Sequence, residues 1–460
     1  MDITISSMDR LFNPKSVAVI GASENSAKLG FHVMKSLIKG RFPGMIVPIN
    51  PGSKEIMGLK AFPSITGLPY EIDLAIVVLP ARMVPAIFEE CQAKVVKGIV
   101  LITAGFREID DPRGVDLHEQ LARILNRDHV PVIGPNTFGM INLHANLNAS
   151  FTPEFSLLKK GSIALVSQSG GMCHLLCFMA IRDDIGFSKI VGIGNRLNVD
   201  FAQMVDYLMQ DPDTDVIALY MEGIDNPKEL IETAKAHKGK KPIIAYKTGI
   251  GDIGNQASRS HTGSLAGRGE IYSGAFTQAG IMGLNSVEAL LDTAKALAGA
   301  PVPNGSGVAI LSSQAGPGIA AADVCQMGGL SIVSFSQETQ DRINDILPPL
   351  ALRTNPVDMG PAWYNSEAIV GILQAVMRDE NVACILLFMM FASANIDSIK
   401  GLSFLLKDRG QTKPLITCLS APPGIWDRHI KQFEEAGILI NFPTPERAAK
   451  VMINLNRYRG

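Results

Sequence analysis

The sequence predicts an α/β protein made of three doubly wound units, each with a parallel sheet covered by helices on both faces. An apolar strand that leads into a glycine-rich turn and a helical segment occurs three times, at 16–38, 161–181 and 306–326. The other apolar segments are nearly continuous runs of Val, Ile and Leu, which is typical of parallel strands buried on both faces. A chain of 460 residues has room for about two to four such domains.

The elements follow in the order that such units require. After the first opening, strands are expected within 44–56, 73–81 and 98–105; after the second, within 215–223 and 241–249; after the third, within 383–391 and 413–420. A helix is expected over 265–280. Polar or proline-rich stretches at 148–161 and 298–307 are expected to be linkers. The predicted domains are therefore residues 1–150, 158–300 and 304–460.

Composition excludes several classes of protein. A formal net charge of −2 argues against a nucleic-acid-binding surface. No apolar run reaches the roughly 18 to 20 residues of a membrane helix, and the first residues do not read as a signal peptide. The six cysteines form no CxxC pair, and Cys173, His174 and Cys177 lie on an apolar helical segment, so neither disulfides nor a metal site is expected. We expect a cytoplasmic protein.

The first glycine-rich turn, GASENSAKLG (21–30), predicts a nucleotide site without fixing the nucleotide. Glycines let the backbone approach a phosphate, and a helix N-terminus attracts anions. The GxGxxG spacing of dinucleotide sites is absent, and the second strand is followed by Asn50 and Lys54 in place of an acidic residue that would bind ribose hydroxyls. A lysine there favours a ligand with an additional phosphate, such as coenzyme A. NADP, and a turn that serves only packing, remain alternatives.

A family resemblance covers essentially the whole chain. The segments VAVIGAS, VPINPGSKEIMGLKAFPSI, DLAIVVLPA, ITAGFREI and VIGPNTFGMIN occur in the order seen in CoA-binding domains; LVSQSGGM, RSHTGSLAG and LPPLALRTNPVDMG continue the likeness. The chain resembles the nucleoside-diphosphate-forming acyl-CoA synthetases of the succinyl-CoA synthetase superfamily, in particular the α subunits of the ADP-forming enzymes. The resemblance implies a CoA-binding Rossmann-like domain followed by two flavodoxin-like domains.

The resemblance also assigns residues to coenzyme A. The implied contacts lie in loops after the carboxyl ends of strands, where open α/β sheets bind ligands: Gly21, Ser23, Lys28, Asn50, Lys54, Pro80, Ala81, Thr103, Ala104, Gly105 and Asn136. Asn136 would lie near the pantetheine end. Thr137 stands where the family often has cysteine.

His261 is the candidate nucleophile. It lies in a polar, glycine-flanked stretch, QASRSHTGSLAG (256–267), and a neutral imidazole can accept a phosphoryl group. Hydroxyl and backbone N–H groups of Thr262, Gly263 and Ser264 can bind the resulting anion. The resemblance implies a second cradle, formed by Gln168, Ser169, Gly170 and Gly171, and a histidine-orienting role for Glu222. A loop carboxylate, and a histidine that merely binds backbone, are the alternatives.

The implied reaction is acyl-CoA + ADP + phosphate ⇌ carboxylate + CoA + ATP, through an acyl phosphate and a phosphohistidine. The chain has no GxxxxGK[ST] loop and no region large enough for an ATP-grasp fold. We therefore expect ATP or ADP, with Mg²⁺, to bind a separate ATP-grasp β subunit in a hetero-oligomer. Competing interpretations are a CoA-responsive regulator, an acyl or carbamoyl transferase without phosphohistidine, and an NADP-dependent oxidoreductase.

The acyl substrate cannot be read from the sequence. Arg196, in GIGNRLNVD (192–200), is hypothesised to favour an acid with a second anionic group, and a surface arginine is the alternative. The NPVD stretch at 355–358 belongs to the third domain, to which we assign no chemistry.

Overall fold

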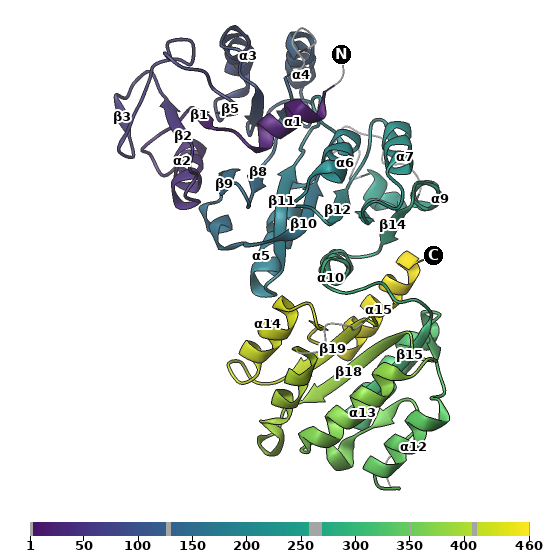
Figure 1. Cartoon of the computed structure of the whole chain (residues 1–460). Coiled ribbons are helices and arrows are strands. Elements are labelled where there is room, and N and C mark those ends of the chain that lie inside the picture. The colour runs from purple at the N-terminus through teal and green to yellow at the C-terminus, as the bar shows by residue number, and fades with distance from the viewer. Residues whose placement is uncertain (1–2, 126–129, 257–268, 350–351, 407–411, 460) are drawn as a thin grey trace. The chain divides into compact units, whose positions relative to one another are not determined.

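The computed structural model describes residues 3–125, 130–256, 269–349, 352–406 and 412–459 (Figure 1). The chain divides into two compact units, Met1–Leu291 and Asp292–Gly460. The first unit contains two large sheets and a small two-stranded one, and the second unit contains one sheet, among the described residues. Among the described residues, no helix combines the length and the apolar character needed to cross a membrane.

The first sheet of unit 1 is parallel, with the strand order β2-β1-β5-β6-β7. Its strands are β1 (Ser16–Ile20), β2 (Met45–Ile49), β5 (Leu74–Val77), β6 (Gly98–Leu101) and β7 (Val132–Ile133). The helices are α1 (Ile5–Phe12), α2 (Leu29–Lys39), α3 (Val84–Ala93) and α4 (Pro112–Leu125), and the small hairpin is β3 (Glu55–Ile56) with β4 (Leu59–Lys60). The order reverses between β1 and β5, which makes the carboxyl ends of these strands a topological switch point.

The second sheet of unit 1 has the order β14-β13-β12-β10-β11-β8-β9. Its strands are β8 (Gly139–Asn142), β9 (Leu147–Ser150), β10 (Lys159–Ser167), β11 (Gly186–Gly192), β12 (Val216–Met221), β13 (Ile243–Lys247) and β14 (Ile281–Leu284). Its helices are α5 (Gly170–Arg182), α6 (Phe201–Gln210), α7 (Pro227–Ala236) and α9 (Gly269–Ala279), and α10 (Val287–Gly299) follows the last strand. The switch point lies between β10 and β12.

The two sheets of unit 1 share one hydrophobic core. A continuous cluster of buried side chains runs from α1 and β1 to β10, β12 and α6. The ring of Phe12 stacks on Tyr207, with 4.9 Å between ring centroids. This shared core explains why both sheets belong to one compact unit.

The stretch 148–161 is not a loose linker, contrary to the sequence-based expectation. It contains the end of β9, the 3-10 helix η2 (Pro153–Leu157) and the start of β10, and β8 and β9 form an antiparallel pair at the edge of the second sheet. Its polar residues misled the prediction because they bond to one another. Asn148 Oδ1 accepts from Ser150 Oγ at 2.6 Å, and Asn148 Nδ2 donates to Thr152 O at 3.1 Å.

Unit 2 contains one parallel sheet, with the order β16-β15-β18-β19-β20 and β17 paired to β15. Its strands are β15 (Gly307–Ser312), β16 (Ser331–Ile332), β17 (Val357–Asp358), β18 (Cys384–Met390), β19 (Leu415–Ser420) and β20 (Ile440–Asn441). Its helices are α11 (Ala315–Met327), α12 (Gln337–Ile346), α13 (Ser366–Arg378), α14 (Asp427–Glu435) and α15 (Pro445–Arg459). Short 3-10 helices are η1 (Ala81–Met83) in unit 1 and η3 (Gly360–Ala362), η4 (Ser393–Asn395) and η5 (Ser398–Leu406) in unit 2.

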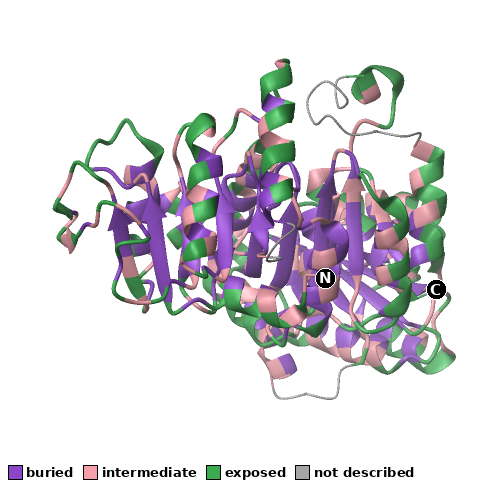
Figure 2. Ribbon diagram, turned by 90° about the horizontal axis from the view of Figure 1, so that it is seen from above, coloured by how far each residue is buried: buried purple, intermediate pink, exposed green. Residues whose placement is uncertain are grey.

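The strands that the sequence predicts are present in all three sheets. Central strands such as β1, β12 and β15 are buried along their whole length. Figure 2 shows that most of the strand arrows are coloured as buried. This confirms the expectation that nearly continuous apolar runs form parallel strands covered on both faces.

Candidate functional site

The switch point of the first sheet holds a cavity of about 670 Å³. The loops after β1, β2, β5 and β6 surround it, which is where an open α/β sheet binds a ligand. Its wall includes these residues that the sequence predicts: Gly21, Ser23, Lys28, Asn50, Pro80, Thr103 and Ala104. A volume of this size falls in the range of sites for cofactor-sized ligands.

Local contacts explain the shape of this cavity. Asn50 Nδ2 donates to Ala22 O at 2.8 Å, and Asn50 Oδ1 accepts from Gly52 N at 2.8 Å, so this side chain ties the end of β2 to the glycine turn. The turn approaches α2 so closely that a Cβ on Gly30 would lie 1.9 Å from Gly21 O. Only glycine fits at position 30, and the close approach leaves the turn backbone facing the cavity.

Four predicted contacts lie outside the cavity wall. Lys54 is exposed on the turn between β2 and β3. Ala81 and Gly105 lie beside each other, since a Cβ on Gly105 would be 3.2 Å from Ala81 Cβ. Asn136 N donates to Thr103 O at 2.8 Å, so the loop of Asn136 packs against the loop that contributes Thr103 to the wall.

Sequence reasoning missed part of the wall. The residues it did not name include Pro63 and Ser64, which follow β4, and Met83, Ile87 and Glu90, which belong to η1 and α3. Met83, Ile87 and Glu90 recur at three- to four-residue intervals, which would place them on one helical face. That periodicity is the signal that could have found them.

The switch point of the second sheet presents the N-terminus of α5. Ser169 is its N-cap, and Ser169 Oγ accepts from Met172 N at 3.4 Å. The first N–H groups of a helix have no intrahelical acceptor, so those of Gly170 and Gly171 are available to an anion. A Cβ on Gly171 would meet no described atom within 4 Å, so the space beside this turn is open.

Glu222 stands directly after β12, across the switch point from α5. It is half-buried. Gln168 Oε1 accepts from Glu222 N at 2.8 Å and from Gly223 N at 2.9 Å, so Gln168 connects the two loops. The side-chain oxygen of Gln168, predicted as a phosphate contact, is thus directed at the backbone of the Glu222 turn. His261, Thr262, Gly263 and Ser264 lie outside the described residues.

Lys247, near the second switch point, is a further residue that sequence reasoning missed. It ends β13 beside β12, is buried, and lies 4.7 Å from the centroid of the Tyr272 ring. Burial lowers the pKa of Lys247 to about 8, and the negative charge of Glu222 opposes that shift. The signal was present in IIAYK (243–247), an apolar strand that ends in a cation.

His174, which lies on the apolar helical segment that the sequence indicated, is half-buried and packs against the protein. Its Nδ1 donates to Gly170 O at 2.8 Å, and its Nε2 lies 2.8 Å from Thr152 Oγ1. The imidazole is surrounded by four aromatic rings: Phe138, Phe151, Phe155 and Phe178. His174 therefore supports the first turn of α5 from behind.

Arg196 fits neither of its two sequence-based interpretations. Its side chain is 0% exposed and pairs with Asp225 at 3.0 Å, so it is neither a surface arginine nor available to a substrate anion. Sequence reasoning misjudged it because the ion-pair partner lies on a different loop, 29 residues away.

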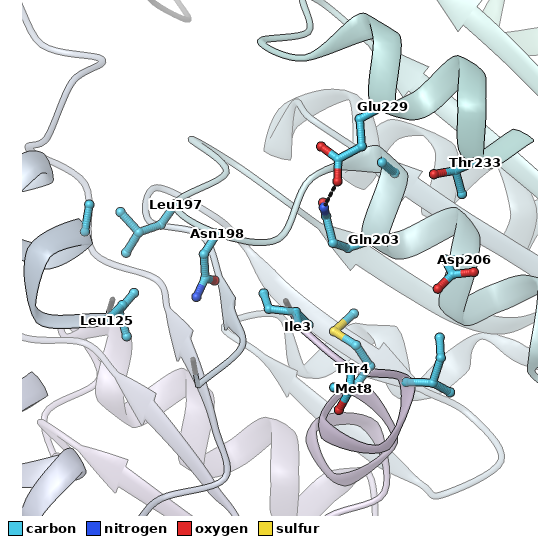
Figure 3. Close-up of a pocket in the computed structure, with 13 residues that line it drawn as sticks. Ile3, Thr4, Met8, Leu125, Leu197, Asn198, Gln203, Asp206, Glu229 and Thr233 are labelled. Carbon is cyan, nitrogen blue, oxygen red and sulfur yellow. Dashed lines mark hydrogen bonds between the residues drawn. The ribbon is translucent and has the colours of Figure 1, made fainter. Parts of the chain in front are cut away.

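Another cavity, of about 520 Å³, lies between α1, α4, α6 and α7 (Figure 3). Several of its polar side chains already have protein partners. Gln203 Nε2 donates to Glu229 Oε1 at 2.5 Å, and Asp206 Oδ1 lies 2.7 Å from His237 Nε2. No predicted site residue lines it, and we assign it no ligand.

Known proteins match this chain along its whole length. Residues 15–142 match a family of CoA binding domains, and residues 160–297 match the succinyl-CoA ligase like flavodoxin domain. The acetate–CoA ligase [ADP-forming] II subunit alpha of Pyrococcus furiosus is 37% identical over 96% of both chains. The acetate–CoA ligase [ADP-forming] I of Archaeoglobus fulgidus is 37% identical over 98% of this chain, which spans 64% of that longer protein.

A solved structure gives the same result. The dinucleotide forming acetyl-coenzyme A synthetase 1 of Ca. Korarchaeum cryptofilum, in complex with phosphate and ADP, superimposes with a TM-score of 0.90 and 32% identity, over 98% of this chain and 97% of that one. The chain therefore belongs to the family of ADP-forming acyl-CoA synthetase α subunits.

Proposed function

We propose that this chain is the CoA-binding, phosphohistidine-bearing α subunit of an ADP-forming acyl-CoA synthetase. The observation that carries the proposal is the pairing of two switch points in one unit. The first holds a cofactor-sized cavity, and the second brings the N-terminus of α5 and the Glu222 turn together through Gln168. Relatives with this domain order are named as ADP-forming acetate–CoA ligases, which supports the same assignment.

The proposed reaction has two halves. In the first, an oxygen of inorganic phosphate attacks the thioester of acyl-CoA; the C–S bond breaks, and the thiolate leaves and is protonated. The resulting acyl phosphate transfers its phosphoryl group to an imidazole nitrogen of His261, so that an N–P bond forms, the O–P bond breaks and the carboxylate leaves. In the second half, a β-phosphate oxygen of ADP attacks the phosphorus and the N–P bond breaks, giving ATP.

The residues of the second switch point have complementary roles in this scheme. The N–H groups of Gly170 and Gly171 bind the phosphoryl oxygens, as helix N-termini do. Glu222 orients the imidazole of His261 through its other ring nitrogen. Phosphoryl transfer depends mainly on positioning and on stabilisation of negative charge, which these groups supply.

The same scheme gives the first cavity to coenzyme A. Lys28, at the N-terminus of α2, would pair with its phosphates, and the glycine turn would approach them through backbone N–H groups. Coenzyme A supplies the thiol.

We also propose the three-domain division at 1–150, 158–300 and 304–460, and a cytoplasmic location.

The partner in this proposal is a separate ATP-grasp β subunit that binds ATP or ADP with Mg²⁺. The name of the Pyrococcus relative as an alpha subunit, and the greater length of the Archaeoglobus relative, support a second component. The substrate is a small carboxylic acid, and acetate is the first candidate to test.

The test is phosphorylation of the chain in complex with its partner. Radiolabelled ATP and Mg²⁺ should give an acid-labile, alkali-stable label on the wild-type chain, and His261→Asn should abolish it. Glu222→Gln should lower the labelling rate by about 10²-fold, because a poorly oriented imidazole attacks slowly. His144→Asn, whose ring contacts Gly161 O and Asp213, is the control and should label normally. Full ligase activity without any label on the wild type would contradict the phosphohistidine.

A further inference from the structure

Polar side chains connect the loops that follow β6, β11 and β12, and so join the two sheets of unit 1. We call them the inter-sheet network; its members are Arg107, Glu108, Asn195, Arg196 and Asp225. The first two belong to the loop that helps to form the coenzyme A cavity. The others belong to the two loops that follow strands of the second sheet.

The carboxylate of Asp225 joins two arginines from different loops. Its Oδ2 lies 2.9 Å from Arg107 Nη2 and 3.0 Å from Arg196 Nη2. The Arg196 side chain is 0% exposed, and that of Arg107 is 21% exposed. The Asp225 side chain is 40% exposed, so the ion pair is buried only on its Arg196 side; separating the two would leave that buried guanidinium without its nearest carboxylate. Asp200 lies 3.8 Å from Arg196 Nε and adds to the stabilisation.

At one end, the network holds the Glu222 turn. Arg196 Nη1 donates to Gly223 O at 2.5 Å. Gln168 Oε1 accepts from the two N–H groups of the same turn. Side chains therefore bind the N–H groups of Glu222 and Gly223 and the carbonyl oxygen of Gly223, and so fix the turn that carries Glu222.

At the other end, the network holds the cavity loop. Arg107 Nη2 donates to Asn195 O, and Asn195 Nδ2 donates to Glu108 Oε2. Glu108 Oε1 accepts from Gly105 N at 2.5 Å, directly after Thr103 and Ala104, which line the cavity. A continuous chain of polar contacts thus runs from the cavity wall to Glu222.

We propose that Arg107 is a positioning residue that keeps the Glu222 turn aligned with the coenzyme A loop. This inference rests on the proposed function. It assigns Arg107 to the coenzyme A-dependent half of the reaction only, because Gln168 and Arg196 still hold Glu222 when Arg107 is changed. Arg196 contributes to both halves of the reaction, because it contacts the Glu222 turn directly.

The test compares the two routes to the same phosphoenzyme in the complete complex. One route uses radiolabelled ATP with Mg²⁺, and the other uses acetyl-CoA with radiolabelled inorganic phosphate. Arg107→Gln should slow the acetyl-CoA route by about tenfold or more and change the ATP route by less than about twofold, because misalignment affects only the step that needs both loops. Arg107→Lys, which keeps a cation and several donors, should restore most of the rate.

Arg113→Gln is the matched control. Arg113 is 86% exposed and pairs with Asp111 beside it, so neither route should change. Equal slowing of both routes in Arg107→Gln, or no slowing relative to Arg113→Gln, would overturn the inference.

Hydrogen exchange tests the same coupling without any phosphorylation. Coenzyme A alone should protect backbone amides of residues 219–226 in the wild type, and Arg107→Gln should lose that protection. If the wild type forms no phosphoenzyme by either route, the proposed function fails, and the exchange result alone decides whether Arg107 couples the two loops. Absence of protection in the wild type would refute the coupling.

Discussion

At the scale of single residues, the second switch point is held together by side chains whose partners lie on distant loops. Gln168, Arg196 and Asp225 illustrate this, because each contacts a segment that follows a different strand. His118, on α4, faces the same region: positive Arg107 and negative Glu108 and Asp225 are the charges that act on it. Its Nδ1 is buried without a partner among the described residues.

His118 gives a prediction for the pH dependence of stability. Burial, and then the charge of Arg107, lower the pKa of His118 to about 4. Between about pH 6.5 and pH 4 the unfolded chain binds a proton there and the folded chain does not, so stability falls as the pH falls. The wild type should lose more unfolding free energy than His118→Asn when the pH falls from 7.5 to 5. The difference should be roughly 1 kcal/mol, after allowance for solvent screening.

Urea unfolding at the two pH values measures this difference. His144→Asn is the control for removal of a more exposed histidine. An equal loss of stability in wild type and His118→Asn would show that His118 is protonated in the folded protein, contrary to the prediction.

At the scale of elements, the N-terminus of α5 is the part of the second switch point that can be tested most cleanly. A Cβ on Gly171 meets no described atom, so Gly171→Ala should fold normally and gain up to about 1 kcal/mol from the higher helix propensity of alanine. If the phosphoryl group occupies the open space, the same methyl group should lower the phosphorylation rate by about tenfold or more.

Thermal unfolding and labelling rates, measured on the same variant, separate these effects. Gly316→Ala is the matched control, because Gly316 also lies in the first turn of a helix, α11, with nothing within 4 Å of its added Cβ. A Gly171→Ala protein with full labelling activity would exclude this helix turn from the phosphate site.

At the scale of the whole molecule, the division between the two compact units falls within α10, and residues 300–306 form a segment of unit 2 without secondary structure, where Pro301, Val302 and Asn304 are exposed. All residues that line the cavity at the first switch point, which we propose binds coenzyme A, lie in the first unit. A protease site inserted after Asn304 should therefore be cut readily. After cutting, the affinity for coenzyme A should change by less than about twofold, since no cavity contact is lost.

Isothermal titration calorimetry of the intact and the cut protein with coenzyme A measures the two affinities. An uncut protein that carries the same insertion is the control. Loss of affinity upon cutting would mean that unit 2 contributes to the cavity or to its stability.

The sequence by itself predicted the architecture. Strand identity follows from apolar runs such as those of β12 and β18. The glycine turns at 21–30 and 167–172, which the sequence singled out as ligand loops, lie at the two switch points of unit 1. Much of the cavity wall was therefore within reach of sequence reasoning.

Only the tertiary structure decided how the site is held together. Whether Arg196 is buried, whether Gln168 binds an anion or the Glu222 turn, and whether Lys54 reaches the cavity depend on loops that are distant in sequence and meet in space. The polar stretch 148–161 was misread for the same reason, because its hydrogen bonds are made inside the fold. Local composition indicates which secondary structure a segment prefers. The hydrogen-bond partner of a buried polar group is set by how other segments pack around it.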